Sequence, residues 1–256
     1  MNLVGAHVPS ADPLAEAASR GADAVQTFLS SPQSWKAPLP RDDAADLVAS
    51  PIRLYVHAPY LVNVASPNNR IRIPSRKILA DTLAAASAVG AAGVIVHGGH
   101  VGDEEEVAVG IERWRKALDS VDISVPILLE NTAGGGNAVL RDVSGYRLLW
   151  EEIGNHNVGV CLDTCHAWAA GEDLATLVAR DTEMTGAVDL IHLNDSRDPL
   201  GSHRDRHANL TEGEIPEELL GAVVSAVDCP ILVETPGGSE EQTADIGWVR
   251  AHLRSS

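Results

Sequence analysis

Eight short apolar runs alternate with segments of helical periodicity along this chain, and this alternation limits its possible folds more than any other feature. The runs are four to six residues long and mostly lack polar–apolar alternation, as expected of strands buried on both faces of a parallel sheet. The predicted strands are Leu3–Val8, Ala24–Leu29, Leu54–His57, Gly93–His97, Pro126–Glu130, Val158–Asp163, Leu190–Asn194 and Pro230–Thr235.

The segments between the runs include predicted helices at Ser75–Val89 and Ile215–Val227. Pro13, Pro74 and Pro216 lie where helices are expected to begin, because proline is favoured in the first turn. Eight such βα units in 256 residues are what one (β/α)₈ TIM barrel of the α/β class requires. A doubly wound sheet would use the same elements, and the number of strands alone does not exclude it.

Composition narrows the class of protein further. No composition break or long linker divides residues 1–256, so we expect a single domain. The N-terminus lacks the basic and apolar regions of a signal peptide, and three unevenly spaced cysteines favour reduced thiols in the cytoplasm. A formal net charge of −17 argues against a protein that coats DNA with a basic face. It leaves open a site where metal ions supply the positive charge.

Polar side chains gather at the C-terminal ends of six predicted strands. In a barrel these ends meet at one face, where active sites are built. A lone histidine there is more often structural, but several uncompensated carboxylates on one face would repel one another. Histidines and divalent cations would remove that cost, and a set without thiolates favours zinc or manganese. The residues are His57, His97, His100, Glu130, Asp163, His166, His192, Asn194, Asp195 and Glu234.

A loop after the seventh strand adds Asp205 and His207 to this set. Residues two apart in an extended segment point the same way, so both side chains could reach one ion. The alternative is a solvated polar loop without a ligand.

Together these motifs resemble the endonuclease IV family of apurinic/apyrimidinic (AP) endonucleases. The resemblance runs from Gly5 to Thr235, in the family's order and spacing, and the family's fold is a TIM barrel. It rests on GAHV, HAPYLVN, VHGGH, LENTAG, CLDTCHAWAAG, HLNDS, GSxxDRHANLxEG and LVET.

The resemblance implies three Zn²⁺ ions per chain, with manganese possible in some sites. The first would be held by His57, His97 and Glu130, and Glu130 would bridge to the second. The second would be completed by Asp163, His192 and Glu234, and the third would be held by His166, Asp205 and His207. Glu130 and Glu234 would be the catalytic carboxylates, with Glu234 orienting the nucleophile or accepting its proton.

The resemblance also implies DNA contacts. Tyr60 matches the family residue that holds the DNA distorted at the lesion. The family's Asn-Gln loop with a basic residue before the tryptophan reads SSPQSWK here, so Gln33 and Trp35 would contact DNA without that cation. We expect a basic rim that includes Arg72 and Arg206; the alternative is that its members pair with surface carboxylates. Its other members would be Arg70, Arg76, Lys77, Arg197 and Arg204.

Some polar residues near the strand ends have less direct roles. His7, His100 and Asn194 are interpreted either as partners of the ligands or as phosphate-facing groups. Cys161 and Cys165 are interpreted as buried side chains that do not bind metal.

The implied activity is base-excision-repair cleavage of damaged double-stranded DNA by a monomeric cytoplasmic enzyme. It would hydrolyse the phosphodiester 5′ to an abasic site, leave a 3′-hydroxyl, and also remove 3′-blocking groups. The main alternative is a sugar isomerase or epimerase of the xylose isomerase-like superfamily, which needs only one or two metal ions. A metal-storing protein or DNA scaffold is a weaker alternative, since neither needs open-sided ligands at a barrel mouth.

Overall fold

The computed structural model describes residues 2–135 and 137–254 and confirms the predicted (β/α)₈ barrel. Eight parallel strands close on themselves, which excludes the doubly wound sheet. The strands are β1 (Val4–His7), β2 (Ala24–Thr27), β3 (Arg53–His57), β4 (Gly93–His97), β5 (Ile127–Glu130), β6 (Val158–Asp163), β7 (Leu190–His192) and β10 (Ile231–Val233). Strand β1 closes the barrel by pairing with both β2 and β10.

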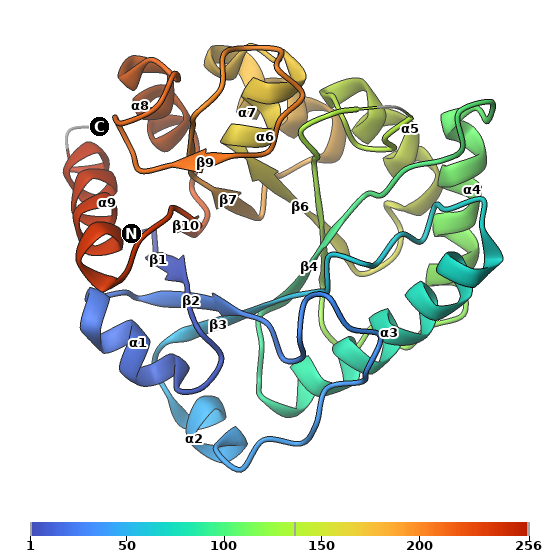
Figure 1. Cartoon of the computed structure of the whole chain (residues 1–256), viewed down its shortest axis with the longest axis horizontal. Helices are drawn as coiled ribbons and strands as arrows, with labels where there is room; N and C mark the ends of the chain where they lie inside the picture. The colour runs from blue at the N-terminus through green and yellow to red at the C-terminus, as the bar shows by residue number, and fades with distance from the viewer. Residues whose placement is uncertain (1, 136, 255–256) are drawn as a thin grey trace.

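Helices surround the strands on the outside of the barrel (Figure 1). Outward strand residues such as Val56, Leu129 and Val233 pack beneath them in a continuous apolar core. The helices are α1 (Pro13–Arg20), α2 (Ala44–Ala49), α3 (Asn69–Ala88), α4 (Val107–Leu118), α5 (Val143–Ile153), α6 (Thr164–Ala170), α7 (Leu174–Thr185), α8 (Glu217–Ala226) and α9 (Ser239–Leu253). Among the described residues, no helix is long and apolar enough to cross a membrane.

Inward strand residues fill the barrel in layers, because successive side chains of a strand point to opposite faces. A buried apolar layer closes the barrel below its C-terminal mouth, so the next inward positions along the strands, two residues further on, line that mouth. This layer is formed by Ala24, Tyr55, Ile95, Leu128, Cys161, Leu190 and Leu232. Six of the polar residues predicted at the strand ends occupy these next positions: His57, His97, Glu130, Asp163, His192 and Glu234.

Several predicted element boundaries were wrong. Strands β2, β7 and β10 end two residues earlier than predicted. Beyond β10 the backbone N–H of Glu234 donates to Asn194 Oδ1 (2.8 Å) instead of to a strand, so the ladder stops there.

Pro74 does not begin a helix. Helix α3 starts at Asn69, because the Asn68 side chain accepts from Arg70 N–H and caps it, and Pro74 lies inside the helix.

A short antiparallel hairpin after β7 was not predicted. Its strands are β8 (Asp195–Ser196) and β9 (His207–Ala208). Both carboxylate oxygens of Asp195 accept backbone N–H groups around this hairpin, including those of Gly213 and Ile215 (2.9 and 3.0 Å). The hairpin carries the Asp205–His207 loop back over the barrel mouth.

Candidate metal centre

Strand register brings the predicted ligands together at the barrel mouth. His97 lies opposite Glu130 in the β4–β5 pair, and Asp163 lies opposite His192 in the β6–β7 pair. Glu130, Asp163 and His192 are fully buried. Nine predicted ligands fall into three groups whose donor atoms lie within 4.8 Å of one another in each group.

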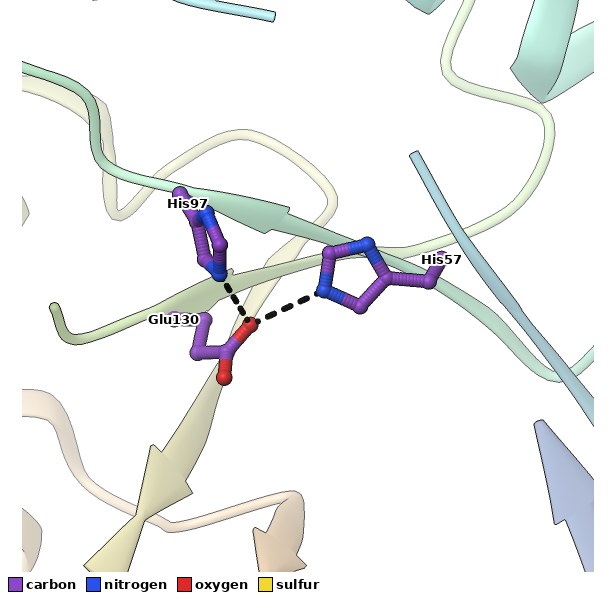
Figure 2. A group of neighbouring side chains, drawn as sticks. All are labelled: His57, His97 and Glu130. Carbon is purple, nitrogen blue, oxygen red and sulfur yellow. Dashed lines mark hydrogen bonds and ion pairs between the residues drawn. The ribbon is translucent and has the colours of Figure 1, made fainter. Parts of the chain in front are cut away.

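His57, His97 and Glu130 form the first group (Figure 2). One carboxylate oxygen, Glu130 Oε2, lies 3.1 Å from His57 Nε2 and 3.2 Å from His97 Nε2. The other ring nitrogen of His57, Nδ1, donates to the Ala58 carbonyl at 2.7 Å, so Nε2 is the nitrogen that faces the group.

Glu130 also belongs to the second group, with Asp163, His192 and Glu234. Its other oxygen, Oε1, lies 3.0 Å from His192 Nδ1, and Glu234 Oε2 lies 3.3 Å from the same nitrogen. The two oxygens of one carboxylate therefore face two different donor groups, the arrangement expected of a bridging ligand.

His166, Asp205 and His207 form the third group. The two oxygens of Asp205 lie 3.2 Å from His166 Nε2 and 3.1 Å from His207 Nε2. Helix α6 supplies His166, and the β8–β9 hairpin supplies the other two. The loop itself is exposed, but it directs the Asp205 and His207 side chains toward His166 at the mouth.

Opposite charges dominate the electrostatics of this cluster. Burial acts to raise the pKa of Glu130, but the nearby His192 and His97 outweigh burial and hold that pKa well below its usual range. Burial acts to lower the pKa of His207, yet the Asp163 carboxylate and a hydrogen bond with Asp205 raise it to about 9. Without metal, protonated histidines neutralise the carboxylates, and a bound cation would displace those protons.

The donor set fits a divalent metal of the zinc type. Buried carboxylates and imidazoles converge without lysine or arginine among them, and zinc accepts both donor types. His207 Nε2 is the ring nitrogen that faces this group, 3.1 Å from Asp205 Oδ1, so an ion that displaces its proton would meet both donor atoms.

His7, His100 and Asn194 were predicted either to support the ligands or to face phosphate, and the structure gives them different contacts. Asn194 donates to Asp163 Oδ2 (2.7 Å) and so supports a ligand directly. His7 Nδ1 lies 3.4 Å from Glu234 Oε1. His100 hydrogen-bonds Asn63 (3.1 Å) and belongs to none of the donor groups.

Two polar residues of this site were missed at the sequence level. Gln26 in β2 contacts His7, His192 and Glu234, and Asn131 contacts the backbone N–H of Asp163 and the ring of His166. A glutamine in the middle of an apolar run was the available signal for the first. Asn131 follows Glu130 directly, so no separate local signal marked it.

The cysteines are buried and reduced. Burial raises the pKa of Cys161 and of Cys165 to about 12, so both are thiols at neutral pH. Cys161 lies beside Glu130 and His192, and Cys165 lies beside Asp163 and His207, so distance alone would admit sulfur as a donor. Cysteine binds metal as the thiolate. Because both cysteines are neutral thiols, we expect the metal ligands to be the histidine nitrogens and carboxylate oxygens.

The predicted DNA contacts lie around the mouth. Tyr60 is 56% exposed, and its ring centroid lies 5.6 Å from that of His57. On the loop after β2, the side chains of Gln33 and Trp35 are both exposed.

Most members of the predicted basic rim also contact the chain itself, some through carboxylates and some through backbone carbonyls. Arg72 donates to the Ser66 and Pro67 carbonyls. Arg206 forms an ion pair with Asp198, with its Nε 2.7 Å from Oδ2. Other members also contact the chain: Arg76 donates to the Arg113 carbonyl, Arg197 to the His207 carbonyl, Lys77 pairs with Asp81, and Arg204 pairs with Asp198.

Comparisons with known proteins agree with this fold and identify its family. Residues 14–255 match the family model described as xylose isomerase-like TIM barrel. Proteins called probable endonuclease 4 from Mycobacterium bovis (strain BCG / Pasteur 1173P2) and Mycobacterium tuberculosis (strain ATCC 25177 / H37Ra) are each 56% identical over 253 residues. The alignments cover 99% of this chain and 100% of each relative.

Two solved structures with similar barrels differ in how similar their sequences are to this chain. Endonuclease IV from Thermus thermophilus has a TM-score of 0.85 at 32% identity, covering 99% of this chain and all of that one. A D-tagatose 3-epimerase-like protein has a TM-score of 0.81 at 18% identity, covering 99% and 97%, and shows a shared barrel alone. From the identity over the full chain, together with the matching barrel, this chain belongs to the endonuclease IV family of nucleases.

Proposed function

We propose that this chain hydrolyses the DNA phosphodiester 5′ to an abasic site, leaving a 3′-hydroxyl, with three zinc ions per chain. One observation carries the proposal: nine histidines and carboxylates form three donor groups, two of which share Glu130. Family membership adds to it, since relatives of this length and identity are called endonuclease 4.

The residues for each ion follow from the three groups. His57, His97 and Glu130 would hold one ion, and Glu130 with Asp163, His192 and Glu234 would hold the second. His166, Asp205 and His207 would hold the third. When bound, such ions supply Lewis acidity toward the phosphoryl oxygens and lower the pKa of a bound water to about 7.

The chain's own residues prepare the reaction. Glu130 keeps two donor groups at a fixed separation, because its two oxygens contact different histidines. Glu234 accepts a proton from the attacking water as the water oxygen bonds to phosphorus, and the P–O3′ bond of the nucleotide before the lesion breaks. The leaving 3′-oxygen takes up a proton from solvent to become the 3′-hydroxyl, and the phosphate stays on the abasic nucleotide. Tyr60, exposed beside His57 and His97, contacts the distorted DNA at the mouth.

The same site would remove 3′-blocking groups, because that reaction breaks the same kind of P–O bond at a 3′ end. Manganese could replace zinc in some positions, since both accept nitrogen and oxygen donors. The sugar-epimerase alternative receives no support beyond the barrel. It does not require the third group or His57 and His97.

A gel assay tests the proposal. The zinc-loaded chain is incubated with a duplex that carries one abasic site, with and without a chelator, and separately with a panel of ketoses. We expect incision 5′ to the lesion only with metal, and no ketose conversion. Ketose epimerisation without incision would overturn the proposal.

A further inference from the structure

We infer that Gln26 is a positioning residue, which fixes the ring orientation and tautomer of His192 and the orientation of Glu234 in the second donor group. The inference rests on the proposed function for its metal. Gln26 is fully buried, and nothing in the family resemblance pointed to it.

Gln26 reaches across the barrel to residues far away in sequence. It lies on β2, opposite His7 of β1 and Tyr55 of β3. Its side chain nevertheless contacts His192 of β7 and Glu234 after β10. One side chain therefore links β1, β7 and the end of β10 within the layer that holds the donor groups.

The hydrogen bonds of Gln26 define which atom donates at each contact. Its Nε2 lies 2.5 Å from Glu234 Oε1 and 2.9 Å from His7 Nδ1, and its Oε1 lies 2.8 Å from His192 Nε2. A primary amide has two N–H donors and a carbonyl acceptor, so these three contacts use its donors fully. The opposite amide orientation would place two acceptor oxygens 2.5 Å apart, with no proton between them.

This orientation fixes the tautomer of His192. Since Gln26 Oε1 can only accept, His192 carries a proton on Nε2 and donates it there. Its Nδ1 lies 3.0 Å from Glu130 Oε1 and 3.3 Å from Glu234 Oε2, inside the second donor group. Without metal this nitrogen donates to those carboxylates, and an ion that displaces its proton would meet the Nδ1 lone pair. The same amide holds Glu234 Oε1, which leaves Oε2 facing that group.

The contacts are also selective. Gln26 bonds His192 and Glu234, and within the described chain it forms no hydrogen bond with His57, His97 or the third donor group. Removing a hydrogen-bond partner behind a metal ligand typically weakens metal binding by about 10–100-fold. Loss of Gln26 should therefore weaken one ion of the three.

The test compares Gln26→Met with the wild-type chain. Methionine keeps the length and volume of glutamine but cannot form these hydrogen bonds. We expect one of three zinc ions to be lost about 10–100-fold more readily in a chelator competition, followed by metal analysis. Imidazole ¹⁵N NMR should show that His192 loses its fixed Nε2 proton, and excess zinc should restore part of kcat with little change in KM.

Gln242→Met is the matched control. Gln242 is also a buried glutamine, but its partners are Arg20 and the carbonyls of His7 and Thr235. This variant should lower thermal stability and keep all three ions at wild-type affinity.

Two results would overturn the inference. One is a Gln26→Met chain that keeps three ions with unchanged affinity and an unchanged His192 tautomer. The other is equal loss of metal in both glutamine variants, which would indicate general destabilisation. A wild-type chain that binds fewer than three ions would instead contradict the proposed function.

Discussion

At the scale of single residues, Glu130 lies at the centre of the proposed site. Its carboxylate lies within 3.4 Å of four imidazoles, those of His57, His97, His166 and His192. Its side chain is fully buried, so bulk solvent does not screen these contacts. Loss of its charge should therefore affect two ions together.

Glu130→Gln keeps the shape and removes the charge. We expect incision of the abasic duplex to fall by at least about 10³-fold, on the scale of losing one group that stabilises developing charge. Metal analysis should show fewer than three ions, and circular dichroism should show an intact fold. Near-normal turnover would contradict the bridging role.

Asp181 on α7 is a buried carboxylate that belongs to none of the metal-binding groups, so its substitution is a control for the Glu130 variant. Its Oδ2 has no hydrogen-bond partner among the described residues, and burial raises the pKa of its carboxyl to about 7. The folded chain therefore binds this proton more tightly than the unfolded chain, whose carboxyl has an ordinary pKa of 3.8. Ionisation of Asp181 therefore lowers the free energy of unfolding as pH rises from about 4 to 7.

Asp181→Asn should remove that cost. The variant should resemble the wild type near pH 4 and gain stability relative to it as pH rises, by about 3 kcal/mol between pH 5 and pH 8. Urea unfolding at several pH values measures the difference, and incision should be unchanged. A pH-independent difference would show that Asp181 is not protonated in the fold.

Sequence reasoning succeeded at residues whose position follows from strand periodicity. Parallel strand ends must meet at one face, so Glu130, Asp163 and His192 could be placed together without a structure. Gln26 was missed because its partners lie across the barrel, and no local pattern identifies which strand faces which across a closed sheet.

At the scale of elements, the β8–β9 hairpin decides whether the third donor group exists. Asp198 is buried on this hairpin, accepts from Arg206, and its carbonyl accepts from Trp168 Nε1 of α6 at 3.0 Å. The ion pair thus holds the loop that carries Asp205 and His207.

Arg206→Ala and Asp198→Ala should weaken the third ion by similar amounts, about 10-fold. The double variant should be no worse than either single one, because both remove the same support. Chelator competition measures the effect. If Arg206 acts chiefly on DNA, only its own variant will change, through a higher KM and unchanged metal retention.

The sequence predicted which barrel strands exist better than it predicted where each strand ends. All eight barrel strands follow from short apolar runs, whereas their ends depend on side chains that take backbone hydrogen bonds, as Asn194 does at Glu234. The hairpin has only two paired residues on each strand, too few for a sequence pattern.

At the scale of the whole molecule, the proposed function requires a chain with a formal charge of −17 to bind negatively charged DNA. Three divalent ions would contribute +6 against a formal charge of −17, which leaves −11 and places positive charge at the phosphate. Because most rim arginines bind the chain itself, we expect few direct phosphate contacts.

The dependence of kcat/KM on salt checks this expectation. The slope of log kcat/KM against log salt should stay shallower than about −4, since each phosphate contact contributes about −0.9. Measurements between roughly 50 and 200 mM salt cover the informative range. A slope near about −8 would require a continuous basic face.

Zinc titration of the metal-free chain tests the central claim most directly. Aliquots receive increasing zinc equivalents, and each is assayed for incision of the abasic duplex and for bound metal. The three donor groups predict that incision rises to its maximum only as the third equivalent binds. Full incision at one equivalent per chain, or none at saturating zinc, would contradict the account.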